Sequence, residues 1–106
     1  MPSYSKGSVV LAEIMFSDNS SGKIRPAVVI NEPHLSSDLF LVPLTSRVTG
    51  LLPGEFELHD WKTAGLHVSS AVKRGIYTVH SRKLVGRLAS ADDALLEQSL
   101  RSWIGL

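Results

Sequence analysis

The sequence contains no cysteine, which excludes disulfides, thiolate nucleophiles and cysteine-based zinc sites, and is compatible with a reducing cytosol. No apolar run approaches the roughly 18 residues of a membrane span, and the polar start of the chain does not resemble a signal peptide. We therefore expect a cytoplasmic protein without membrane association. Paired metal-ligand histidines, Gly-rich phosphate loops and dinucleotide fingerprints are also missing, so we expect no metal and no cofactor.

Charge of either sign is nearly balanced, with a formal net charge of +1 over 106 residues. The 43% hydrophobic content is enough for one packed core, so we expect a single domain over residues 1–106. The charges are distributed less evenly along the chain, because the stretch from Trp61 to Ala91 has no acidic residue. Its basic residues form either a basic face or a solvated rim of strand ends; they are Lys62, Lys73, Arg74, Arg82, Lys83 and Arg87.

Short β-branched and apolar segments alternate with turn formers along most of the chain. They predict strands at 8–16, 24–32, 39–44, 55–59, 67–72, 76–81 and 85–88. Loops are expected at 17–23 and 46–54, and the two strand prolines, Pro26 and Pro43, indicate edges or a bulge. An apolar stripe of Leu96, Leu100, Trp103 and Ile104 predicts a C-terminal helix that covers a sheet. The fold class is therefore mainly β with a C-terminal helix, as in a small bent sheet or SH3-like barrel.

Two strand ends carry residues suited to binding phosphate. Arg25 precedes Pro26, which biases it toward an extended conformation in which its planar fork can face a phosphate. Thr45 and Ser46 offer adjacent hydroxyls. Each pattern has an ordinary structural interpretation as well: Arg25 as an exposed arginine before an edge strand, and Thr45 and Ser46 as a turn cap. Four histidines are possible general bases, but His67 and His80 fall in predicted strands, where packing or surface positions are commoner.

The motifs, taken in order, resemble the MazF/PemK toxin family over nearly the whole chain. They are Gly7-Ser-Val-Val, Lys23-Ile-Arg-Pro-Ala-Val-Val-Ile30, Val42-Pro-Leu-Thr-Ser46, Gly65, Val72-Lys73, the segment TVHSRKLVGRL and a terminal Trp-Ile-Gly. The resemblance implies an SH3-like barrel of the CcdB/MazF type, usually a homodimer. It also implies a toxin of a type II toxin–antitoxin system, with a cognate antitoxin that docks over the RNA groove.

The activity that the resemblance implies is metal-independent endoribonuclease cleavage of single-stranded RNA, by attack of a ribose 2′-hydroxyl on the adjacent phosphate. Arg25 and Thr45 match the family's catalytic arginine and threonine. The candidate substrate-binding residues are Lys23, Ser46, Ser69, Ser70 and Lys73. Loop 17–23 would close over RNA or be displaced by the antitoxin.

The chain departs from the family pattern at acid and base positions. Loop 17–23 has no histidine, and the positions that carry charged pairs in some members read Val68-Ser-Ser-Ala71. The general acid and base are thus unassigned. Two other functions stay open, an inert SH3-like binding module and a gyrase-poison-type inhibitor. The second would act through the terminal helix, where Trp103 and Ile104 instead look like packing residues.

Overall fold

A computed structural model describes most of the chain. The described ranges are 6–14, 23–32, 35–59, 61–63, 65–81, 84–90 and 93–105. The predicted loop at 17–23 lies outside them, apart from the backbone of Lys23, and so do Arg82 and Lys83. Within the described residues, no helix is long and apolar enough to cross a membrane.

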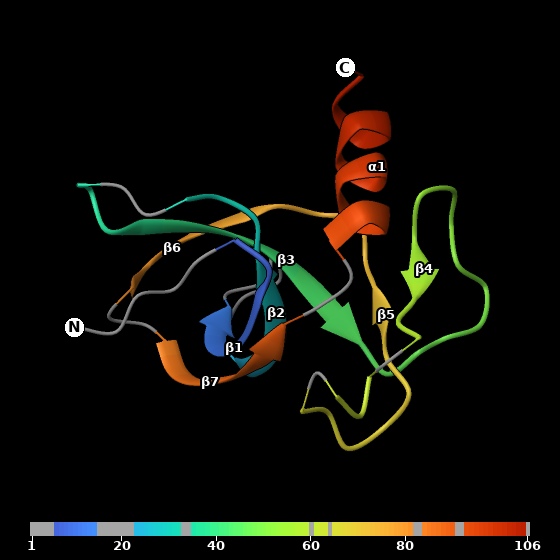
Figure 1. Cartoon of the computed structure of the whole chain (residues 1–106), viewed down its shortest axis with the longest axis horizontal. Helices are drawn as coiled ribbons and strands as arrows, with labels where there is room; N and C mark the ends of the chain where they lie inside the picture. The colour runs from blue at the N-terminus through green and yellow to red at the C-terminus, as the bar shows by residue number, and fades with distance from the viewer. Residues whose placement is uncertain are drawn as a thin grey trace.

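The described residues form seven strands and one C-terminal helix (Figure 1). In chain order they are β1 (Ser8–Ile14), β2 (Lys23–Val29), β3 (Asp38–Thr45), β4 (Phe56–Glu57), β5 (Ala71–Val72), β6 (Tyr77–His80), β7 (Leu84–Ser90) and α1 (Asp93–Ile104). The predicted fold class, mainly β with a terminal helix, is confirmed.

The pairing is antiparallel throughout, in the order β4-β5-β3-β2-β1-β7. The long strand β3 has two different partners on one side, β6 along Asp38–Leu41 and β5 at Leu44 and Thr45. Figure 1 shows β3 running from β6 at one end of the molecule to β5 and β4 at the other. The strand path stays open, with no pairing between β4 and β7 in the described part of the chain.

Two of the predicted strands are much shorter than the sequence indicates. Only Phe56–Glu57 and Ala71–Val72 pair as strands within the predicted 55–59 and 67–72. Before β5, the Ser70 hydroxyl donates to the Val68 carbonyl at 3.0 Å. Such local side-chain bonds offer the backbone an alternative to a ladder, so residues 67–70 form a loop instead of a strand.

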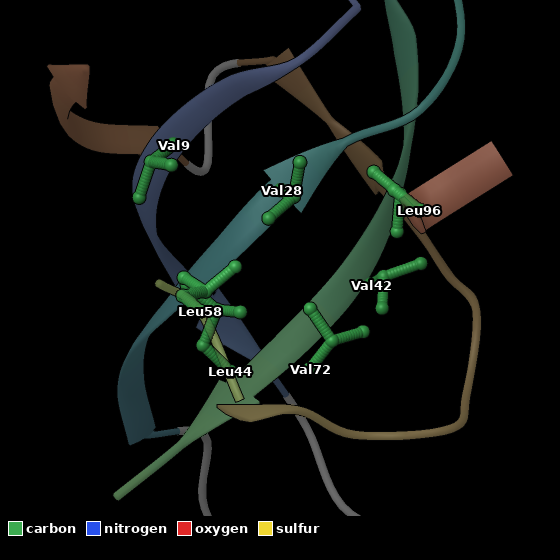
Figure 2. Packing of buried hydrophobic residues seen from close by; sticks show 7 residues of the cluster. All are labelled: Val9, Val28, Val42, Leu44, Leu58, Val72 and Leu96. Carbon is green, nitrogen blue, oxygen red and sulfur yellow. The ribbon is translucent and has the colours of Figure 1, made fainter. Parts of the chain in front are cut away.

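Alternation along the strands divides the buried residues between two faces of the bent sheet. One cluster, shown in Figure 2, gathers Val9, Val28, Val42, Leu44, Leu58, Val72 and Leu96. The other gathers Val10, Ala12, Ala27, Val29, Leu39 and Leu41. Neighbouring residues of β1, β2 and β3 therefore serve different cores, which explains why these strands read as continuous apolar runs.

The helix α1 covers the first cluster, as its apolar stripe predicts. Leu96 is buried, and Leu100 and Trp103 pack against the cluster. Gly54, at φ +88°, lies so close to Trp103 that an added Cβ would collide with the indole nitrogen, so this glycine lets the 46–54 loop reach the helix. Ile104 is 58% exposed; its prediction as a packing residue is wrong, because it lies beyond the edge of the apolar stripe that faces the sheet.

Candidate functional site

Strands β2 and β3 are paired at one end and parted at the other. Their register runs from Val29↔Leu41 to Ala27↔Pro43 and stops there. Before Ala27, β2 pairs with β1 alone, so Pro26, which has no N–H to donate, lies on a local edge as predicted. Past Pro43, β3 pairs with β5 instead. The two strands separate at the positions where their register, if continued, would place Arg25 opposite Thr45.

Pro43 does not lie on an edge strand, which was one of the two positions expected for it, because β3 is an inner strand of the sheet. The proline falls between the two partners of β3 on that side, after the pairing with β6 ends at Leu41 and before the pairing with β5 begins at Leu44. Its missing N–H therefore costs no ladder bond to either strand. Its carbonyl is still used, accepting the N–H of Lys73 at 3.0 Å.

A cavity of about 620 Å³ opens where the two strands part, within the range of roughly 300–1,000 Å³ that ligand sites occupy. Its apolar lining residues from the strands are Leu11, Pro26, Pro43 and Leu44. Residues 65–68, from the loop before β5, form another wall. The cavity thus joins strand ends that are far apart in the sequence.

Arg25 and Thr45 both line this cavity. Arg25 is exposed, and its guanidinium can offer several N–H donors to an anion. Thr45 is half-buried, and its Oγ1 accepts the backbone N–H of Arg47 at 3.1 Å. Because that bond uses an acceptor site of the hydroxyl, the hydroxyl proton stays available for donation to a bound group.

The other residues predicted to bind substrate are placed differently from one another. Ser46 and Lys73 line the cavity with exposed side chains. Ser70 also lines it, but is 3% exposed and donates its hydroxyl to Val68. Ser69 is not among the lining residues, and its hydroxyl donates to the Glu57 carboxylate. The side chain of Lys23 lies outside the described residues. The substrate-binding roles of all five residues stay predictions.

His67 is a cavity residue that the sequence patterns did not single out. It lies in the exposed loop before β5 and lines the cavity together with Arg25 and Thr45. The sequence suggested a strand position for it, and no local motif distinguishes it from the other histidines. Its place depends on a turn that closes between Trp61 and Leu66, whose backbone groups bond at 3.0 Å.

The cavity is cationic, since Arg25 and Lys73 line it and no carboxylate does among the described lining residues. Glu55 lies on the adjoining loop, and the backbone N–H groups of Leu52 and Arg74 hold the pKa of its carboxyl below the ordinary value. Trp61 packs against the first core cluster, with the Lys62 ammonium 5.5 Å from its ring centre. No group of three or more potential metal ligands occurs in the described part of the chain.

The sequence model of the family described as "PemK-like, MazF-like toxin of type II toxin-antitoxin system" matches residues 5–103. Among curated proteins, no sequence gives a significant match.

Solved structures resemble the chain over nearly its whole length. MazF in the MazE–MazF complex (form II) of Deinococcus radiodurans gives a TM-score of 0.75 at 21% identity, covering 100% of this chain and 99% of that one. The Mycobacterium tuberculosis toxin MazF-mt6 gives 0.73 at 20%, covering 93% and 97%. An endoribonuclease in complex with its cognate antitoxin, from a mycobacterial species, gives 0.73 at 16%, covering 100% and 97%. These likenesses confirm the predicted fold of the MazF type, mainly β with a C-terminal helix, and the open strand path is compatible with the predicted barrel.

Proposed function

The chain belongs to the family of PemK-like, MazF-like toxins of type II toxin–antitoxin systems, and on that premise we propose that it is an endoribonuclease. Its substrate is single-stranded RNA, cut without a metal ion in the cavity between β2 and β3. The observation that carries the proposal is the meeting of Arg25 and Thr45 in that cavity, beside a second cation, Lys73.

The reaction begins with attack of a ribose 2′-hydroxyl on the adjacent phosphorus. The bond from O2′ to phosphorus forms as the bond to O5′ breaks, which yields a 2′,3′-cyclic phosphate and a 5′-hydroxyl. The 2′-hydroxyl loses its proton and the departing O5′ gains one. Negative charge builds on the non-bridging phosphate oxygens in the transition state, so donors placed there in advance accelerate the reaction.

Arg25 supplies the main stabilisation in this scheme, because a guanidinium can bond two phosphate oxygens at once. Thr45 donates its free hydroxyl proton to the same phosphate, while the backbone N–H of Arg47 donates to the Thr45 Oγ1 and holds the hydroxyl in place. Ser46 and Lys73 contact the neighbouring backbone phosphates. Contacts of this kind position the strand without reading its sequence.

The partners follow from the family and from the structures that the chain resembles. Two of those structures are toxin–antitoxin complexes, and we infer a cognate antitoxin for this chain that covers the cationic cavity. We also propose that the toxin acts in the cytoplasm as a homodimer.

The test compares purified wild-type protein with Arg25→Ala on mixed-sequence single-stranded RNA. Losing a charge-assisted phosphate contact, which is worth about 1.5–3 kcal/mol, should slow the appearance of 2′,3′-cyclic phosphate ends roughly 10- to 150-fold. The fold should persist, since the Arg25 side chain is exposed. Arg101→Ala, at an exposed position on α1, is the matched control. Wild-type cleavage by Arg25→Ala, or no cleavage by either protein, would refute the proposal.

A further inference from the structure

The cavity holds three ionisable side chains among its described lining residues, and only one of them is suited to accept a proton. Arg25 and Lys73 are cationic side chains at neutral pH, with donors and no acceptor. Thr45 and Ser46 carry hydroxyls, which are weak bases. The third ionisable group is His67, whose neutral imidazole has one ring nitrogen free to accept.

The proposed reaction also needs a proton acceptor, which these hydrogen-bond donors do not provide. Arg25, Lys73 and Thr45 can stabilise charge on the phosphate, but the attacking 2′-hydroxyl must also lose its proton. The charged groups that line the cavity with His67 are Arg25 from β2 and Lys73 from the segment just after β5. Among the described lining residues none is a carboxylate, and the side chain there that can accept the proton is the His67 imidazole.

The loop that carries His67 is held from both ends by hydrogen bonds. The Leu66 N–H donates to the Trp61 carbonyl at 3.0 Å, and the Leu58 N–H donates to the Ser70 carbonyl at 2.9 Å. Between these ends, Ser69 donates to Glu57 and Ser70 donates to Val68. Among the described residues none is hydrogen-bonded to the imidazole, which lines the cavity.

We propose that His67 is the general base of the reaction, which rests on the proposed ribonuclease function. One ring nitrogen of the neutral imidazole takes the 2′-hydroxyl proton as O2′ bonds to phosphorus. The departing O5′ receives its proton from solvent, and the imidazolium then releases its own proton to solvent. The base thereby comes from the loop before β5, and not from the first loop or from the positions where some family members carry charged pairs.

The experiment measures single-turnover cleavage of a defined oligoribonucleotide that wild-type protein cuts, as a function of pH. Removing a general base typically costs about 10²–10⁴-fold in rate, so His67→Ala and His67→Gln should both fall by about 100-fold or more. The wild-type rate should decline in acid, because a protonated imidazole cannot accept the 2′-hydroxyl proton, and this acidic decline should be missing in both variants. His59→Ala, at an exposed histidine outside the cavity, should match wild type.

A second substrate distinguishes a general-base role of His67 from a general-acid role. When sulfur replaces the bridging O5′, the leaving group no longer needs a proton, so loss of a general acid would be largely repaired. We expect His67→Ala to stay as impaired on this substrate as on normal RNA, with binding of an uncleavable 2′-O-methyl RNA within about threefold of wild type.

Three results would overturn the assignment. They are full activity in His67→Gln, a preserved acidic limb in His67→Ala, and restoration of the rate by the sulfur substrate. Any of these, together with the loss of cleavage in Arg25→Ala, would reject His67 as the base and leave the ribonuclease function standing. Absence of cleavage by wild type would instead reject the proposed function.

Discussion

The two ends of the β2–β3 pair differ in composition and in what holds them. At the paired end, Ala27–Val29 meet Leu41–Pro43, and all of these side chains except that of Pro43 are buried in the two core clusters. At the parted end, the same strands carry Arg25 and Thr45 at the lining of an open cavity. One pair of strands thus supplies the core at one end and the candidate site at the other.

The parted end is held by loops, through polar contacts. Glu55 accepts backbone N–H groups from Leu52 and Arg74, at 2.8 and 2.9 Å. Glu57 accepts the hydroxyl of Ser69, and Pro43 accepts the N–H of Lys73. Burial of apolar surface, which stabilises the paired end, does not depend on protonation, whereas bonds to carboxylates do. Substitutions at the two ends should therefore affect different properties.

The largest effect is expected at the paired end. Leu41 is fully buried in the second cluster, and Leu41→Ala should lower the free energy of unfolding by about 2–5 kcal/mol, from lost burial and from the cavity left behind. Urea unfolding followed by circular dichroism measures this loss. RNA cleavage per folded molecule should stay near wild type, because Leu41 does not line the candidate site.

Leu35→Ala is the control, because Leu35 is 99% exposed. It should change the free energy of unfolding by no more than about 0.5 kcal/mol. Equal destabilisation by the two substitutions would show that burial of Leu41 does not stabilise the paired end.

A smaller and pH-dependent effect is expected for Glu55→Gln. The two backbone N–H groups lower the pKa of the Glu55 carboxyl from its ordinary 4.5, so folding favours the charged form. The resulting stabilisation is present above the unfolded value of 4.5 and is lost as pH falls through the lowered folded value. At neutral pH the variant should lose about 1 kcal/mol.

The measurement is urea unfolding of wild type and Glu55→Gln at neutral pH and at about pH 3. The difference between the two proteins should shrink in acid, where the carboxyl is protonated more fully. Glu32→Gln, at an exposed carboxyl without a described partner, should show no difference at either pH. A gap for Glu55→Gln that is equally wide at both pH values would show that the carboxylate charge does not stabilise this end.

The fold was predictable where local pattern and burial agree. The continuous apolar runs in β1, β2 and β3 and the stripe of Leu96 and Leu100 all pack as the sequence indicates. The lengths of β4 and β5 were not predictable, because they are set by bonds such as Leu58 to Ser70 between segments whose pairing no local pattern reveals. The exposure of Ile104 was not predictable either, because the apolar stripe does not show which of its residues contact the sheet, as Leu100 and Trp103 do.

The candidate site was partly predictable. Arg25 and Thr45 fall on motifs with a recognisable order, and the register of β2 and β3 brings them to the same cavity. His67 was assigned to a strand, because the turn that carries it to the cavity is closed by the bond between Leu66 and Trp61. The role of Ser69 as a substrate-binding residue is still a prediction, and the structure adds a contact that the sequence did not reveal, from its hydroxyl to the Glu57 carboxylate.

The smallest effect on the cleavage rate is expected for Ser69→Ala, which removes one hydrogen bond at the parted end. If Ser69 holds the His67 loop through Glu57, its loss costs one hydrogen bond of about 0.5–1 kcal/mol and slows cleavage about two- to fivefold. Glu57→Ala should then have a similar effect, and the double variant should be no slower than either single variant, because both remove the same bond. Affinity for uncleavable RNA should be unchanged in all three. A loss of affinity in Ser69→Ala that Glu57→Ala does not share would show instead that Ser69 binds RNA directly.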